Sequence, residues 1–84
     1  MALIVVASFP VAVVVLGDNA TTTLDVDISQ DPYNIQGTIK RVQDLTVTGV
    51  VGLTATRTFS GSTVSLTFSA PFVGNAFVHF SALI

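Results

Sequence analysis

His79 is the only side chain in this sequence whose usual pKa lies near neutrality, so it is the first candidate for acid–base chemistry. It lies between Val78 and Phe80 in an apolar run, and the chain has no Cys and no Glu to pair with it. The sequence also contains no motif for a catalytic serine with an adjacent base, because none of the seven serines lies in a nucleophile-elbow sequence. We therefore expect no enzymatic activity, and we expect His79 to lie in the core or in an interface.

Acidic residues at alternate positions are the best candidate for a metal site. Asp25, Asp27 and Asp31 follow the spacing at the start of an EF-hand calcium loop. Gln30 stands where that loop has its turn glycine, and Gln36 stands where it has its bidentate glutamate. A solvated strand face is the competing interpretation of the three aspartates. We expect no other metal and no cofactor.

The charge content of the chain excludes one class of partner. Only 10% of the 84 residues are charged, and the formal net charge is −2. The cations are Lys40, Arg41 and Arg57, too few for the basic footprint that a nucleic acid requires. The surface must therefore be built from hydroxyl, amide and apolar side chains, and such surfaces favour contact with another protein.

The composition predicts an all-β protein. The chain has 14 Val and 11 Thr, which pack well on a pleated sheet, and few good helix formers. Short alternating segments separated by turn residues predict seven or eight strands. We expect one small antiparallel β-sandwich or jelly-roll-like domain over residues 1–84.

Individual segments give more specific predictions. Residues 21–29 alternate cleanly and predict a strand with Leu24, Val26 and Ile28 facing inward. Residues 33–42 predict a second strand with a bulge at a glycine. Residues 60–62 predict the turn of a hairpin, and residues 72–84 predict a final strand that is divided at Gly74.

The N-terminal apolar run, residues 1–17, allows two interpretations. A signal or membrane anchor would normally carry basic flanking residues, but no Lys or Arg precedes Lys40. We therefore favour two strands, residues 2–7 and 11–16, with Pro10 at the break between them, and we expect no membrane contact. The alternative is a small membrane-associated protein anchored by residues 1–16.

Two runs are apolar on both faces, which predicts that they are covered by a second subunit. They are residues 11–16 and residues 77–84. A chain of this size has too small a core to cover both runs by itself, so we expect a homo-oligomer. The predicted interface residues are Val11, Val13, Val15, Phe77, His79, Phe80 and Leu83.

The stretches 21–29, 53–70 and 76–84 resemble the small virion proteins of tailed bacteriophages, and in particular the capsid decoration or cement proteins. The likeness lies in a short, cysteine-free, charge-poor chain rich in Val, Thr and Ser. It implies a β-sandwich or jelly-roll trimer on the capsid surface of a virion. It also implies a non-enzymatic role, with a major capsid protein or another virion protein as partner.

A carbohydrate-binding or adhesion module is the alternative function. Such a module stacks sugars on aromatic side chains, and here Tyr33, Phe72 and Phe77 would have to supply the platform.

Overall fold

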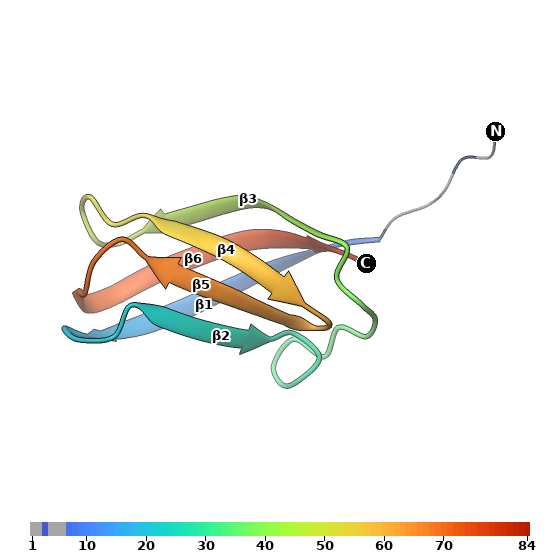
Figure 1. Cartoon of the computed structure of the whole chain (residues 1–84), viewed down its shortest axis with the longest axis horizontal. Coiled ribbons are helices and arrows are strands. Elements are labelled where there is room, and N and C mark those ends of the chain that lie inside the picture. Colours follow the sequence, from blue (N-terminus) through green and yellow to red (C-terminus); the bar gives the residue numbers. More distant parts are fainter. Residues whose placement is uncertain (1–2, 4–6) are drawn as a thin grey trace.

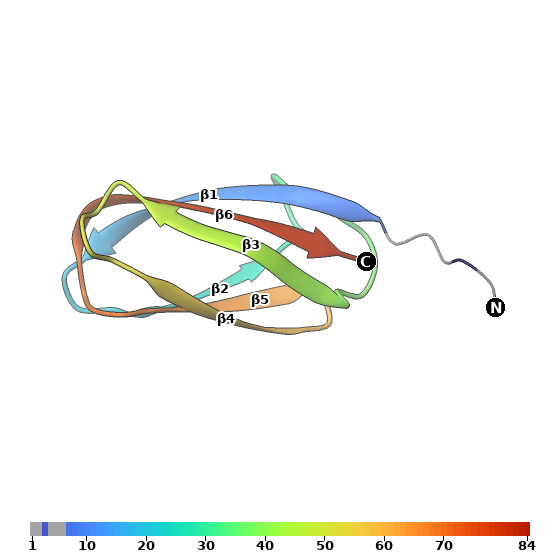
Figure 2. The ribbon, with the colours of Figure 1, turned by 90° about the horizontal axis from the view of Figure 1, so that it is seen from above.

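The computed structural model of this chain describes residue 3 and residues 7–84. These residues contain no helix and form six strands. The strands are β1 (Ser8–Asp18), β2 (Thr23–Asp27), β3 (Arg41–Thr48), β4 (Ala55–Ser60), β5 (Thr63–Phe68) and β6 (Val73–Leu83). They make two three-stranded antiparallel sheets that lie face to face (Figures 1 and 2). The prediction of an antiparallel all-β sandwich is confirmed.

The two sheets are each built around a central strand. Sheet A has the order β1-β6-β3, and sheet B has the order β2-β5-β4. β6 pairs with β1 along its whole length, from Leu83 opposite Ser8 to Val73 opposite Asp18. Only the β4–β5 connection stays within one sheet, and every other connection crosses between the sheets. Apart from β4 and β5, consecutive strands therefore belong to different sheets, and the two sheets enclose one core.

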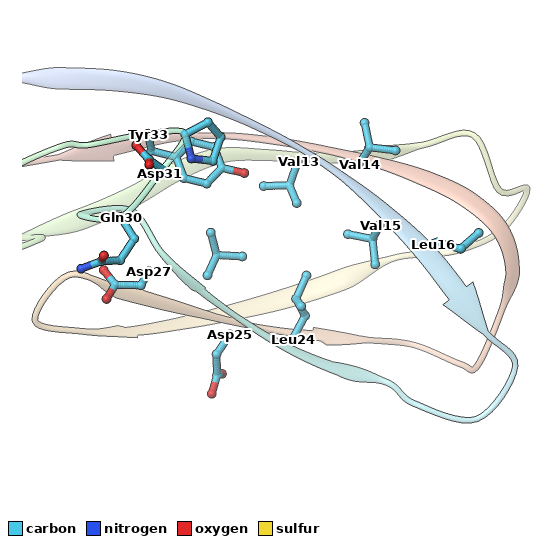
Figure 3. A pocket seen from close by; sticks show the side chains of 12 residues that line it. Val13, Val14, Val15, Leu16, Leu24, Asp25, Asp27, Gln30, Asp31 and Tyr33 are labelled. Carbon is cyan, nitrogen blue, oxygen red and sulfur yellow. The ribbon is translucent and has the colours of Figure 1, made fainter.

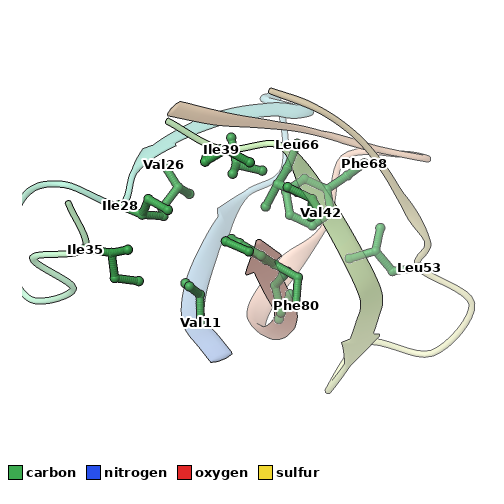
Figure 4. Close-up of a cluster of buried hydrophobic side chains, with 14 of the residues drawn as sticks. Val11, Val26, Ile28, Ile35, Ile39, Val42, Leu53, Leu66, Phe68 and Phe80 are labelled. Atoms are coloured by element: carbon green, nitrogen blue, oxygen red, sulfur yellow. The ribbon is translucent and has the colours of Figure 1, made fainter. Parts of the chain in front are cut away.

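Strand alternation fills the space between the sheets with apolar side chains. On β6, Ala76, Val78, Phe80 and Ala82 are buried, while the residues between them face outward. Sheet B supplies Val26 from β2 and a buried row from β5 (Figure 4). At roughly 25 cal/mol per Å² of apolar surface removed from water, this burial is the main stabilising contribution.

The predicted hairpin is confirmed in detail. β4 and β5 meet at Ser60 opposite Thr63, and Gly61 takes a positive φ of 60° in the turn between them. Val64 and Leu66 are fully buried, whereas Thr67 on the other face is exposed. The strand predicted within residues 21–29 is also confirmed, as β2.

Seven to eight strands was too many, and the jelly-roll arrangement is not confirmed. Pro10 does not break the N-terminal run but lies inside β1. An edge strand tolerates proline because its outer side has no ladder to lose. Gly74 does not divide the final strand either. It takes a φ of 90° opposite Gly17, and β6 continues through it.

The strand predicted over residues 33–42 is wrong for most of its length, because strand structure begins only at Arg41. The segment before it crosses the end of the sandwich. The N–H of Ile35 donates to the carbonyl of Ile28 at 2.8 Å, and that of Ile39 donates to Gly61 at 2.8 Å. Both isoleucine side chains are buried. The apolar residues Ile35 and Ile39 resembled the inward face of a strand because both side chains cover the core from this loop.

The predicted strand over residues 2–7 lies almost wholly outside the described residues. From Ser8 onward the N-terminal run forms β1, not a helix. In the part of the chain that the structure describes, no helix is long and apolar enough to cross a lipid bilayer.

Candidate interaction surface

His79 lies on the outer face of sheet A, where its side chain is exposed. Its cross-strand neighbours are Ala12 on β1 and Thr46 on β3. Neither neighbour carries a carboxylate that could orient the imidazole for catalysis. The predicted core position is therefore wrong, and the predicted interface position of His79 stays a prediction.

The three aspartates of the calcium hypothesis have separate structural roles. Asp27 Oδ1 accepts hydrogen bonds from the Ser29 amide at 3.0 Å, the Ser29 hydroxyl at 2.7 Å and the Ser62 hydroxyl at 2.9 Å. Asp31 accepts one from the Asn34 amide group at 2.8 Å. Asp25 points away from the other two (Figure 3). Among the described residues, no three His, Cys, Asp or Glu side chains gather closely enough to hold a metal ion.

The hydrogen bonds to Asp27 connect two turns. The Ser29 hydroxyl and amide, followed by the Ser62 hydroxyl, lower the pKa of the Asp27 carboxyl. Ser62 belongs to the β4–β5 turn, so the charged carboxylate ties that turn to the end of β2. Asp27 therefore acts as a structural cap and not as a metal ligand.

Asp18 performs a similar task in the turn that follows β1. Its Oδ1 accepts hydrogen bonds from the amides of Ala20 at 2.9 Å and Thr21 at 2.7 Å. Its Oδ2 accepts one from the Thr21 hydroxyl at 2.6 Å. Led by the Thr21 hydroxyl, these donors lower the pKa of Asp18 from 3.8 to about 2.

The seven predicted interface residues divide between the two sides of sheet A. Val11 and Phe80 are buried in the chain's own core, and Val13 and Val15 point toward the same interior but are half-buried. Phe77, on the opposite side, is exposed together with His79; the seventh residue, Leu83, is half-buried. The odd-numbered valines of β1 therefore help fill this chain's own sandwich. Only the exposed members present side chains to the outside of sheet A.

An apolar patch occupies part of the outer face of sheet A. Its members are Val14 and Leu16 from β1 with Val73 and Phe77 from β6, and we call them the outer patch. Their exposed fractions are 63%, 77%, 70% and 49%, in that order. Val14 lies directly opposite Phe77 in the ladder. The sequence prediction missed three of the four, Val14, Leu16 and Val73, although they lie on the same face of sheet A as Phe77.

The sandwich is open along the side between β1 and β2. No Cα atom of β1 lies within 8 Å of a Cα atom of β2, both of which are described throughout, whereas β3 and β4 do approach that closely. On the closed side, the Arg57 Nε of β4 donates to the Val42 carbonyl of β3 at 2.8 Å. This hydrogen bond joins the edges of the two sheets, and the sequence did not predict it.

A groove of about 590 Å³ occupies the open side. Its walls are residues 13–16 of β1 and residues 24–27 of β2, and residues 30–33 close one end. Val13, Val15 and Leu24 lie along it as apolar lining (Figure 3). These side chains are only half-buried, because no strand lies between the two edges.

The aromatic platform of the carbohydrate hypothesis does not form. Phe72 is buried, and its ring packs against that of Phe68 with the ring centroids 5.1 Å apart. Tyr33 is half-buried beside the groove, and its hydroxyl donates to the Ala12 carbonyl at 3.4 Å. Three stacked aromatic faces are therefore not available on one surface.

Comparison with models of known protein families, with characterised proteins and with solved structures finds no match for this chain.

Proposed function

We propose that this protein is a structural, non-enzymatic component of an assembly, which it joins through the outer face of sheet A. The observation that carries the proposal is the outer patch. Four large apolar side chains stand exposed on one sheet, in a chain with very few charges. Large apolar side chains that are exposed together on one face mark contact sites in soluble proteins.

The contrast between the two outer faces supports the choice of surface. The outer face of sheet B carries threonines, serines and aspartates in rows, such as Thr23, Thr67 and Thr56 side by side on its three strands. Such a hydroxyl-rich face is well solvated without a partner. The outer face of sheet A instead exposes Val14 and Phe77 as a cross-strand pair, and burying them would remove apolar area from water.

The assembly that we propose is the shell of a tailed-bacteriophage virion, with this chain as a decoration or cement protein on the capsid surface. The sequence resemblance supports that role. It also implies that the chain forms a homo-oligomer, and specifically a trimer. The partner would be the major capsid protein or another virion protein. A contact repeated at every position of a shell adds up to large stability even where each contact is weak.

The oligomeric state of surface variants tests the proposal. We expect the wild-type chain to be an oligomer in light scattering, and Leu16→Ser or Phe77→Ser to be a monomer. Val51→Ser is the matched control, because Val51 is fully exposed but lies in the β3–β4 turn, outside the outer patch. A wild-type chain that stays monomeric at high concentration, or variants that assemble as well as the control, would contradict the proposal.

Membership of a virion has its own test, since assembly alone does not identify the shell. Genes for virion proteins cluster with the gene for the capsid protein, so we expect such a gene beside the one for this chain. A neighbourhood without any virion gene would argue against the decoration role while leaving the interaction surface in place.

A further inference from the structure

β1 is the least protected of the four edge strands. β2 carries Asp25 and Asp27 along its edge, β3 is interrupted by a bulge at Asp44, which has a φ of 58°, and β4 is bridged to β3 by Arg57. Charges, bulges and coverage of this kind prevent unwanted strand pairing. Residues 8–17 of β1 have no charge and no bulge, and Pro10 is their only residue of a type that blocks strand pairing.

The hydrogen bonds at β1 show which of its backbone groups are free. The Ile84 N–H donates to the Ala7 carbonyl at 2.9 Å, so the odd-numbered residues of this strand bond to β6. The even-numbered residues point their N–H and C=O groups the other way, and the Tyr33 hydroxyl accordingly reaches the Ala12 carbonyl. Val14 and Leu16 therefore direct four backbone groups toward the open side, beside the groove.

A matching apolar segment exists in the same chain. Residues 2–7 read Ala-Leu-Ile-Val-Val-Ala, without a charge, proline or glycine. Six extended residues span about 20 Å, and the edge over residues 12–16, where the Ala12 carbonyl already accepts from Tyr33, spans about 17 Å. The segment also has apolar side chains on both faces, as a strand would need if it lay between the groove and the outer patch.

The segment cannot reach this edge within its own chain. Ala7 already bonds to Ile84 at the start of the β1–β6 ladder. If the chain turned back over two residues directly before Ala7, residue 2 would come to lie beside Phe9 or Pro10, well short of Val14. Only a second copy can place residues 2–7 beside residues 12–16.

We propose that residues 2–7 of one copy add as a strand to the free edge of β1 in a second copy. Strand addition satisfies the backbone groups of Val14 and Leu16. Alternate donor side chains would fill the groove against Val13, Val15 and Leu24, and the others would extend the outer patch. This inference rests on the proposed assembly and deepens it by naming the contact.

The symmetry of this contact agrees with a closed ring. Donor segment and acceptor edge are different parts of one chain, so the contact allows a reciprocal exchange between two copies, and it also allows a ring in which each copy gives its segment to one neighbour and receives one from another. Contacts of this heterologous type generate rings when the rotation closes. A trimer is one such ring.

Cross-linking between copies tests the proposal directly, because the natural chain has no cysteine. Full-length Ile4→Cys and Val5→Cys proteins, whose thiols would lie on opposite faces of the added strand, are each mixed with Val14→Cys protein and a short bis-maleimide. We expect a cross-linked heterodimer with at least one of them. Thr56→Cys, exposed on the outer face of sheet B, is the matched control acceptor. A yield with Val14→Cys no higher than with this control would overturn the proposal, and so would Val14→Cys cross-linking mainly to itself.

Proline substitution separates this contact from the outer patch. Val14→Pro removes an N–H that points away from the β1–β6 ladder, so we expect the fold to remain by circular dichroism while the oligomer dissociates. Because Val14 also belongs to the outer patch, Val14→Ala, which shortens the same side chain but keeps the N–H, is the side-chain control and should weaken the oligomer less. Ser8→Pro is the control, because Ser8 has the same outward parity but lies outside the groove. If Phe77→Ser dissociates the oligomer but Val14→Pro does not, the proposed function stands and the strand addition is wrong. If the wild-type chain is a monomer, the assembly itself is wrong.

Discussion

At the residue scale, the aspartates act as turn caps. Asp18 closes the turn after β1 and Asp27 joins two turns, each by accepting hydrogen bonds as a carboxylate. The sequence allowed two interpretations for Asp27, a calcium loop and a solvated strand face. Alternating aspartates have the same spacing on a solvated strand as in a calcium loop, so the pattern alone could not distinguish the two.

The lowered pKa of Asp18 predicts a specific pH dependence. Because the folded state lowers this pKa from 3.8 to about 2, the contribution of the carboxylate to stability is fully present above about pH 4. It is lost as the pH falls toward 2, where the folded protein also takes up the proton. Asp18→Asn should therefore lower Tm at pH 6 and flatten the decrease in Tm between pH 4 and pH 2.

Thermal unfolding followed by circular dichroism measures this effect. Asp25→Asn is the control, because Asp25 accepts no hydrogen bond from the described residues. A wild-type protein and an Asp18→Asn variant with parallel Tm curves over this range would show that the turn does not depend on the charge.

At the element scale, β6 separates core from surface by alternation. Phe80 is fully buried between the sheets, and Phe77 is half-exposed on the outer face. The sequence prediction placed both in one interface because the run 72–84 is apolar at almost every position. In the structure, one parity of this run packs inside and the other forms part of the outer patch.

Alanine substitutions at these two phenylalanines should have different effects. Phe80→Ala should lower the free energy of unfolding by about 3–5 kcal/mol, since it leaves a cavity in the core. Phe77→Ala should cost the monomer much less and should instead weaken the oligomer. Denaturant titration measures the first effect and light scattering the second. Equal losses of unfolding free energy in the two dilute monomers would show that the faces of β6 are assigned wrongly.

At the scale of the whole molecule, the sandwich is closed on one side and open on the other. Arg57 joins β4 to β3, while β1 and β2 leave a groove between them. The central place of β6 in sheet A determines what a C-terminal truncation would measure. Removing the last eight residues would delete most of the central strand of sheet A and part of the core, so that truncation would report on folding rather than on assembly.

Stability that depends on protein concentration follows from assembly. If copies associate in the folded state only, mass action raises Tm as the protein concentration rises. We expect the wild-type Tm to increase between micromolar and millimolar chain, and the Leu16→Ser variant to lose most of that increase. Differential scanning calorimetry at two concentrations checks this. A wild-type Tm that does not change with concentration would contradict coupled folding and assembly.

The sequence by itself determined the all-β class, the β2 strand and the hairpin at Gly61, because β-branched alternation and turn residues are local signals. It could not determine the strand count, since Pro10 and Gly74 break a strand only where their backbone groups would be needed for pairing. Only the tertiary structure decided which parity of residues 11–16 faces inward and that the loop around Ile35 and Ile39 covers the core. It also decided that the β1 side stays open. These outcomes depend on which distant strand lies alongside, and no local pattern contains that information.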